Sequence, residues 1–116
     1  MKKFIVDRIE IKETETGQKY IDIYDANNKN WYEEQKDFKA GTLKVMYNKD
    51  TRLVLSKNKD ISMLAPTMVG DVVEEIESDD IFINPCQHFV DGKLVELQTY
   101  EKIENGKVVF NREKRI

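Results

Sequence analysis

Apolar and polar residues alternate in short runs along most of the chain, which is the pattern of β-strands. β-Branched and aromatic residues are common in these runs, and clusters of glycine, asparagine or aspartate separate them. In one run, Ile21 and Ile23 are expected to point inward, while Tyr20 and Tyr24 share the opposite face. The pattern before the C-terminal third predicts strands over these stretches: 4–12, 20–24, 42–47 and 52–56.

Two turn motifs near the end of the chain give the most specific local prediction. Asp91-Gly92 and Asn105-Gly106 each lie between apolar runs, and such pairs favour type I′ turns because both central residues need positive φ. Together they predict a three-stranded antiparallel meander over 81–90, 93–104 and 107–116. The first turn also sets a register that places Val90 opposite Lys93, Phe89 opposite Leu94, His88 opposite Val95, and Cys86 opposite Leu97.

Residues 67–77 fit two kinds of element. Their apolar residues are spaced as on one face of a helix. However, Gly70 lies inside the pattern, and two adjacent valines favour a strand. A strand is therefore the preferred interpretation. The whole chain is expected to form a single all-β domain over 1–116, with hairpins over about 1–65 and the meander over about 81–116. The architecture predicted is a small antiparallel barrel or sandwich, with a short helix near 67–77 as the alternative.

The composition is that of a soluble domain of ordinary size. The chain has 116 residues, of which 40% are hydrophobic and 35% charged. No apolar run is long enough to span a bilayer, so no membrane contact is expected. A single cysteine, Cys86, rules out an internal disulfide framework. A location in the cytoplasm or in a virion is therefore predicted.

The sequence offers little for catalysis or metal binding. Cys86 and His88 lie two residues apart on one strand, about 7 Å from each other, which exceeds the reach of a base to its nucleophile. A zinc site needs three or four ligands, and the chain has no further histidine or cysteine. The five glycines are isolated, so no phosphate-binding loop is present. We therefore expect no enzyme, no metal and no cofactor, with Cys86 and His88 packed under the sheet.

Charge is distributed unevenly around a net charge of −3. Residues 36–59 are mainly basic, and residues 71–80 contain six acids and no base. The acidic stretch is a candidate protein interface, and one alternative function is that of an inhibitor that presents it to a basic protein surface. Its acidic residues are Asp71, Glu74, Glu75, Glu77, Asp79 and Asp80.

Aromatic residues near the basic stretch raise a second alternative, an OB-like protein that binds single-stranded nucleic acid. Such folds hold a strand by stacking its bases on aromatic rings beside lysines that contact the phosphates. The sequence pI of about 5.3 opposes this function, because affinity for the phosphate backbone depends on a basic surplus. The candidate residues are Tyr20, Tyr24, Trp31, Lys36, Lys39 and Lys44.

The segments 89–97 and 103–110, each built around an Asp/Asn-Gly-Lys turn, resemble short hairpins of phage and prophage tail-associated proteins. The resemblance implies a non-catalytic virion or assembly module. The leading hypothesis is therefore a small acidic module that acts through contacts with a protein partner or with itself. The outer edge of the last predicted strand, 107–116, is the expected docking position.

Overall fold

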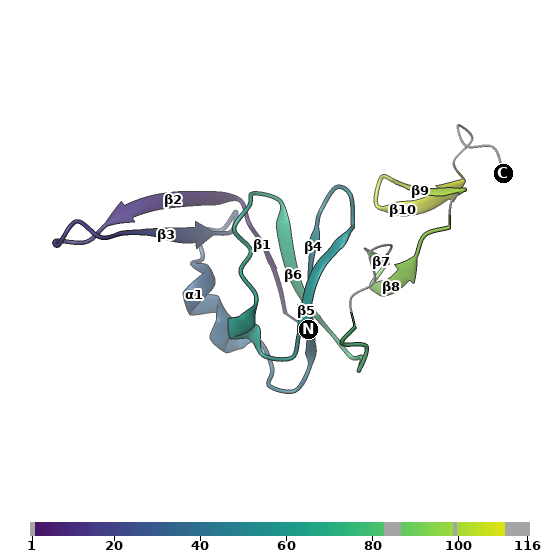
Figure 1. Cartoon of the computed structure of the whole chain (residues 1–116), viewed down its shortest axis with the longest axis horizontal. Coiled ribbons are helices and arrows are strands. Elements are labelled where there is room, and N and C mark those ends of the chain that lie inside the picture. Colours follow the sequence, from purple (N-terminus) through teal and green to yellow (C-terminus); the bar gives the residue numbers. More distant parts are fainter. Residues whose placement is uncertain (1, 83–86, 99, 111–116) are drawn as a thin grey trace.

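The computed structural model describes residues 2–82, 87–98 and 100–110, and most of them lie in antiparallel strands (Figure 1). Among these residues there is one short α-helix, α1 (Trp31–Glu34), which continues into the 3-10 helix η1 (Gln35–Asp37). A second 3-10 helix is η2 (Ile61–Met63). The strands are β1 (Lys3–Ile5), β2 (Arg8–Glu13), β3 (Lys19–Tyr24), β4 (Leu43–Asn48), β5 (Val54–Asn58), β6 (Asp71–Ile76), β7 (Gln87–Val90), β8 (Lys93–Glu96), β9 (Glu101–Glu104) and β10 (Lys107–Phe110).

The predicted all-β class is confirmed, with the helix in a different place. Residues 71–76 form β6, as the preferred interpretation of 67–77 expected, and the α-helix lies at 31–34 instead. Asn30 explains that position, because its side chain accepts a hydrogen bond from the Tyr32 amide at 2.8 Å and caps the helix. The sheets are open, and the strands that the structure describes form no closed barrel.

A four-stranded sheet with the order β1-β6-β4-β5 forms the centre of the molecule. Its register aligns Phe4 with Val73 and Val73 with Met46, so these side chains share one face. Tyr47 pairs with Val72 on the other face. Both faces are covered, which explains why β4 and β6 are buried along nearly their whole length.

The first core packs α1 and the base of β3 against the sheet. The Trp31 ring lies 5.1 Å from that of Phe4 and 5.8 Å from that of Phe38, measured between centroids. Aromatic pairs at this separation add to the stabilisation that comes from buried area. The buried residues of this core are Phe4, Val6, Ile23, Trp31, Phe38, Leu64 and Val73.

The second core lies under the β7–β8 hairpin. Phe89 packs its ring 4.8 Å from that of Tyr47, and its amide donates to the Arg52 carbonyl at 2.8 Å. An isolated β-bridge between Leu53, just before β5, and His88 of β7 adds a second backbone contact between these two segments. The buried residues here are Leu43, Val45, Tyr47, Val54, Val72 and Phe89.

The single strand predicted over 4–12 is wrong, because two strands in different sheets replace it. β1 pairs with β6 in the central sheet, whereas β2 pairs with β3. At the junction the Val6 amide donates to the Asp71 backbone carbonyl, and the Asp7 amide donates to the Tyr24 backbone carbonyl. The alternation of polar and apolar residues continues through the junction, so only the distant partners reveal the break.

The three-stranded meander is also wrong, although both of its turns are confirmed. Asp91, Gly92, Asn105 and Gly106 all have positive φ, between 51° and 76°. The register is as predicted for Val90 with Lys93, Phe89 with Leu94 and His88 with Val95. Cys86 lies outside the described residues, as do residues 111–116 of the predicted last strand.

The middle strand of the predicted meander is interrupted after Glu96 and resumes at Glu101. Two hydrogen bonds join Gln98 and Glu101: the Gln98 amide donates to the Glu101 carboxylate, and the Glu101 amide donates to the Gln98 carbonyl, each at 3.0 Å. The chain therefore forms two separate hairpins, β7–β8 and β9–β10.

The molecule is elongated, with principal extents of 59 × 31 × 23 Å. The β2–β3 and β9–β10 hairpins lie on opposite sides of the central sheet (Figure 1). We call the β2–β3 hairpin, residues 8–24, the N-terminal arm. We call residues 100–110, which contain the β9–β10 hairpin, the C-terminal arm.

Candidate functional site

The residues predicted to bind nucleic acid do not form one surface, since two of them are structural. Trp31 and Lys44 are each only 1% exposed. The Lys44 ammonium donates to three backbone carbonyls, those of Lys39 at 2.5 Å, Thr42 at 3.0 Å and Lys59 at 2.8 Å. Its charge is thus used inside the fold, where it satisfies the ends of two loops.

The other four residues of that set are more accessible but lie on separate elements. Tyr20 and Tyr24 share one face of β3, as predicted, and Tyr20 is exposed. Lys36 is in η1, and Lys39 follows it with an exposed side chain. The structure therefore does not assemble the aromatic rings and the lysines into a single stacking surface.

The predicted acidic interface is divided in the same way between buried and exposed positions. Asp71 and Glu75 are buried in β6, and Asp71 accepts a hydrogen bond from the Met68 amide. Glu74 accepts from the Tyr47 hydroxyl at 2.8 Å. Burial, followed by this bond to Glu74, raises the pKa of Tyr47. These three carboxylates serve the fold.

The remaining three acids follow β6 and are exposed or partly paired. Asp79 binds Lys59 at 3.0 Å. Asp80 lies 3.3 Å from the Lys57 ammonium and accepts from the Gln87 amide nitrogen at 3.0 Å. The hydrogen bond from Gln87, together with Lys57, lowers the pKa of Asp80. Glu77 is exposed, so the free negative surface is much smaller than the run of six acids predicts.

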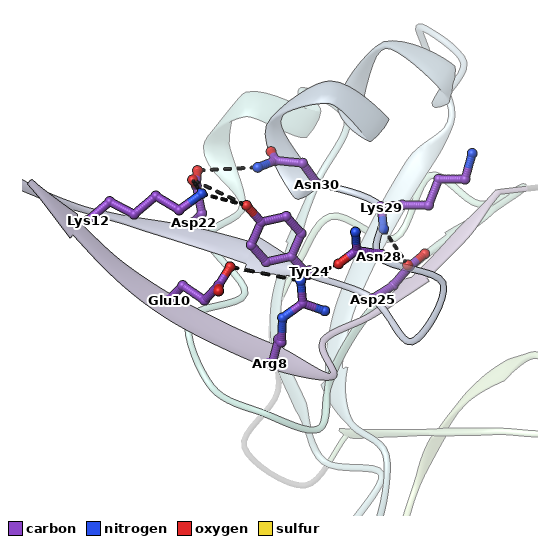
Figure 2. A network of polar contacts seen from close by, with 9 residues as sticks. All are labelled: Arg8, Glu10, Lys12, Asp22, Tyr24, Asp25, Asn28, Lys29 and Asn30. Atoms are coloured by element: carbon purple, nitrogen blue, oxygen red, sulfur yellow. Dashed lines mark hydrogen bonds and ion pairs between the residues drawn. The ribbon is translucent and has the colours of Figure 1, made fainter.

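One face of the N-terminal arm carries a network of polar contacts (Figure 2). The Lys12 ammonium contacts Asp22 at 2.8 Å and the Tyr24 hydroxyl at 2.8 Å, and the Arg8 guanidinium lies 4.2 Å above the Tyr24 ring. Asn30 donates to the second oxygen of Asp22 at 3.2 Å. The bond to Asp22 raises the pKa of Lys12, and the same bond lowers the pKa of Asp22.

The opposite face of the N-terminal arm carries four isoleucines. Ile9 pairs with Ile23 and Ile11 pairs with Ile21 across the two strands. Their exposure rises toward the tip, since Ile23 is buried in the first core whereas Ile11 is 75% exposed. The arm thus presents an apolar surface that the described part of the chain does not cover.

The C-terminal arm is the second surface with exposed apolar groups. Phe110 is 60% exposed and Tyr100 is 38% exposed, and their ring centroids lie 6.1 Å apart. Within the described residues, β9 and β10 pair only with each other. Each of these two strands therefore has an outer edge that could accept another strand.

The described ranges contain neither a cluster of metal ligands nor a membrane-crossing helix. No group of three or more histidine, cysteine or acidic residues there is arranged to hold a metal ion. His88 pairs with Val95 and is half-buried, and Cys86 lies outside those ranges. Among the same residues, no helix has the length and apolar character needed to cross a membrane.

Sequence patterns alone did not reveal the polar network or the exposed rings of the C-terminal arm. The network depends on the register of β2 with β3, which places Arg8 opposite Tyr24 and Glu10 opposite Asp22. The sequence does contain one signal for that register, which is Gly17. This glycine has a φ of 83° in the turn that closes the hairpin. No local signal distinguishes the exposed Phe110 from a core residue.

The chain is similar to two curated proteins, both of them tail fiber assembly proteins U′. It is 29% identical over 99 residues to the protein of Escherichia phage Mu and 30% identical over 100 residues to that of Escherichia phage P1. Each match covers 81% of this chain and 53% of the relative, so the chain spans about half the length of these relatives. No protein-family model matches the sequence. The resemblance to phage tail-associated proteins is thereby confirmed.

Proposed function

We propose that this chain takes part in the assembly of a phage tail fibre, as a module that acts by protein contacts rather than by chemistry. The observation that carries the proposal is its similarity to tail fiber assembly proteins over 81% of its length. The protein would act in the cytoplasm of the infected cell or remain on the virion, and mass spectrometry of purified particles distinguishes these two locations.

The C-terminal arm is the surface that we assign to the fibre protein. An extended segment of a partner can add to a free strand edge through main-chain hydrogen bonds, while pockets for side chains select its sequence. β10 offers such an edge, and the exposed rings of Tyr100 and Phe110 lie beside it. Aromatic rings of this kind often supply much of the binding energy at an interface.

Co-expression with the tail fibre protein of the same phage tests the proposal. A tagged chain is expected to retain the fibre protein on an affinity column, and Phe110→Ser is expected to reduce the retained amount about tenfold or more. Phe82→Ser is the matched control, because Phe82 is 80% exposed but lies outside the C-terminal arm. That variant should retain as much fibre protein as the unaltered chain.

Two results would count against the proposal in different ways. If the fibre protein is never retained, the assembly function itself is wrong. If it is retained equally by the unaltered chain and by Phe110→Ser, the function stands but the C-terminal arm is not the binding surface. Circular dichroism of both variants shows whether the substitution has affected folding.

A further inference from the structure

The outer edge of β2 has backbone groups that none of the described strands pairs with. Across the turn of the arm, the Thr14 amide donates to the Gln18 carbonyl at 2.8 Å, so the backbone groups of Thr14 point toward β3. The backbone groups of successive residues in a strand point alternately to its two sides. The backbone groups of Ile9, Ile11 and Glu13 consequently point away from β3. Within the described residues, none of these groups meets a backbone partner outside the hairpin.

This edge is apolar on one face, where Ile9 and Ile11 project, and charged on the other, where Arg8, Glu10 and Lys12 project. It carries no proline, and Figure 1 shows the arm extending away from the central sheet, so no other element among the described residues covers it. Ile11, in the middle of the edge, is 75% exposed. An exposed edge strand with an apolar β-branched residue is a template for pairing with another strand.

We propose that two copies of this chain pair through β2, antiparallel, about a two-fold axis that passes between the two Ile11 residues. In this arrangement Ile11 faces Ile11 of the second copy, and Ile9 faces Glu13. These are the residues whose backbone groups point outward, so each pair exchanges its main-chain hydrogen bonds. The result is a four-stranded sheet with the order β3-β2-β2-β3.

Charge complementarity selects the second copy as the occupant. On the polar face, the two-fold axis places Glu10 opposite Lys12 of the other copy, and the symmetry repeats the pair. Lys12 already contacts Asp22 and Tyr24, and its three donors leave one for the new partner. On the apolar face, Ile11 lies opposite Ile11 of the second copy. The isoleucine surfaces of the two arms thereby become continuous.

Neighbouring registers are less favourable. An axis through Glu10 would place Glu10 against itself and Arg8 against Lys12, and an axis through Lys12 would place Lys12 against itself. An axis through Ile9 would bring Val6 and Asp7 into the pairing. The amides of both residues already donate within the fold, to the backbone carbonyls of Asp71 and Tyr24. Of these four axes, only the one at Ile11 both avoids like-charge pairs and keeps the pairing within the free part of β2.

A charge exchange tests the register directly. Glu10→Lys and Lys12→Glu each place like charges across the interface, so each variant alone should associate about tenfold or more weakly than the unaltered chain. When the two variants are mixed, every cross-pair is again of opposite charge, and association should return. Sedimentation equilibrium measures the mass relative to the 13.7 kDa chain.

Cross-linking supplies a second readout that does not depend on charge. In a Cys86→Ser background, Ile11→Cys should form a disulfide between copies on oxidation, because residues that face each other in a bonded pair are about 5.5 Å apart at Cα. Ile9→Cys is the matched control, because the proposed register places each Ile9 opposite Glu13 and away from the other Ile9. It should remain unlinked.

Three results would overturn the proposal. The first is an unaltered chain that stays monomeric at the highest soluble concentration. The second is a mixture of the two charge variants that associates no better than either variant alone. The third is equal cross-linking of the Ile11→Cys and Ile9→Cys variants. The self-association does not rest on the role in fibre assembly, and its tests contain no fibre protein.

Discussion

Glu75 is a buried carboxylate that joins three segments of the chain. It is 2% exposed, and it accepts hydrogen bonds from the Lys2 amide at 2.8 Å, the Lys39 amide at 3.0 Å and the Thr42 hydroxyl at 2.7 Å. Burial acts to raise its pKa, but the bonds from Thr42, Lys2 and Lys39 outweigh burial. The pKa of Glu75 therefore lies below its ordinary value of 4.5.

Replacing Glu75 by glutamine should lower the free energy of unfolding at neutral pH by about 2 kcal/mol, because an amide cannot accept all of these bonds and brings a donor without a partner. The stabilisation by the carboxylate is fully present above the unfolded pKa, near 4.5, and is lost as the pH falls through the lower folded pKa. Urea denaturation at several pH values should therefore show the two proteins converging in acid.

Glu77→Gln provides the control for this prediction. Glu77 follows the same strand but is exposed, so its replacement should change the stability by less than about 0.5 kcal/mol. Equal effects of the two substitutions at neutral pH, or a difference that grows in acid, would contradict the structural role assigned to Glu75.

At the scale of elements, Trp31 shows how the short helix α1 is attached to the rest of the fold. Its ring packs between Phe4 of β1 and Phe38, and of the two buried side chains of α1, Trp31 and Glu34, it is the apolar one that joins this core. A four-residue helix is too short to be stable alone, so it depends on such packing. Trp31→Ala should therefore lower the free energy of unfolding by about 3–5 kcal/mol. Tyr32→Ala, at a residue of the same helix that is 56% exposed, should cost less than about 1 kcal/mol.

Urea denaturation followed by circular dichroism measures both substitutions, since Trp31 is the single tryptophan and its fluorescence is lost in the variant. Similar stabilities for Trp31→Ala and Tyr32→Ala would mean that the helix is not anchored in this way. The same result would reopen the interpretation of Trp31 as an exposed residue for stacking nucleic-acid bases.

The elements that depend on local turn chemistry were predictable, and those that depend on distant partners were not. Asp91-Gly92 sets both a turn and the register of its hairpin, because only a few residue types accept positive φ at both positions. The pairing of β1 with β6 joins residues about 70 positions apart, and nothing near Phe4 encodes it. Lys44, a sequence candidate for contacting nucleic acid, is buried for a related reason, since β4 is a central strand with both faces covered.

At the scale of the whole molecule, stability is expected to be uneven between the central sheet and the C-terminal arm. The sheet lies between two cores, whereas β9 and β10 pair only with each other among the described strands. At the tip of that arm, Gly106 lies close to the Arg52 guanidinium of the body. An isolated two-stranded hairpin is at best marginally stable in water.

Amide hydrogen exchange should resolve this difference. The bonded amides of β4 and β6 should exchange only with global unfolding, whereas those of β9 and β10 should exchange on the order of 100-fold faster or more, because opening the hairpin exposes little buried apolar surface. If the C-terminal arm binds the fibre protein through β10, the complex should slow exchange in the arm and leave the central sheet unchanged. Equal protection of both regions in the free chain would instead show that the arm is already held as firmly as the sheet, and would contradict the predicted difference in stability.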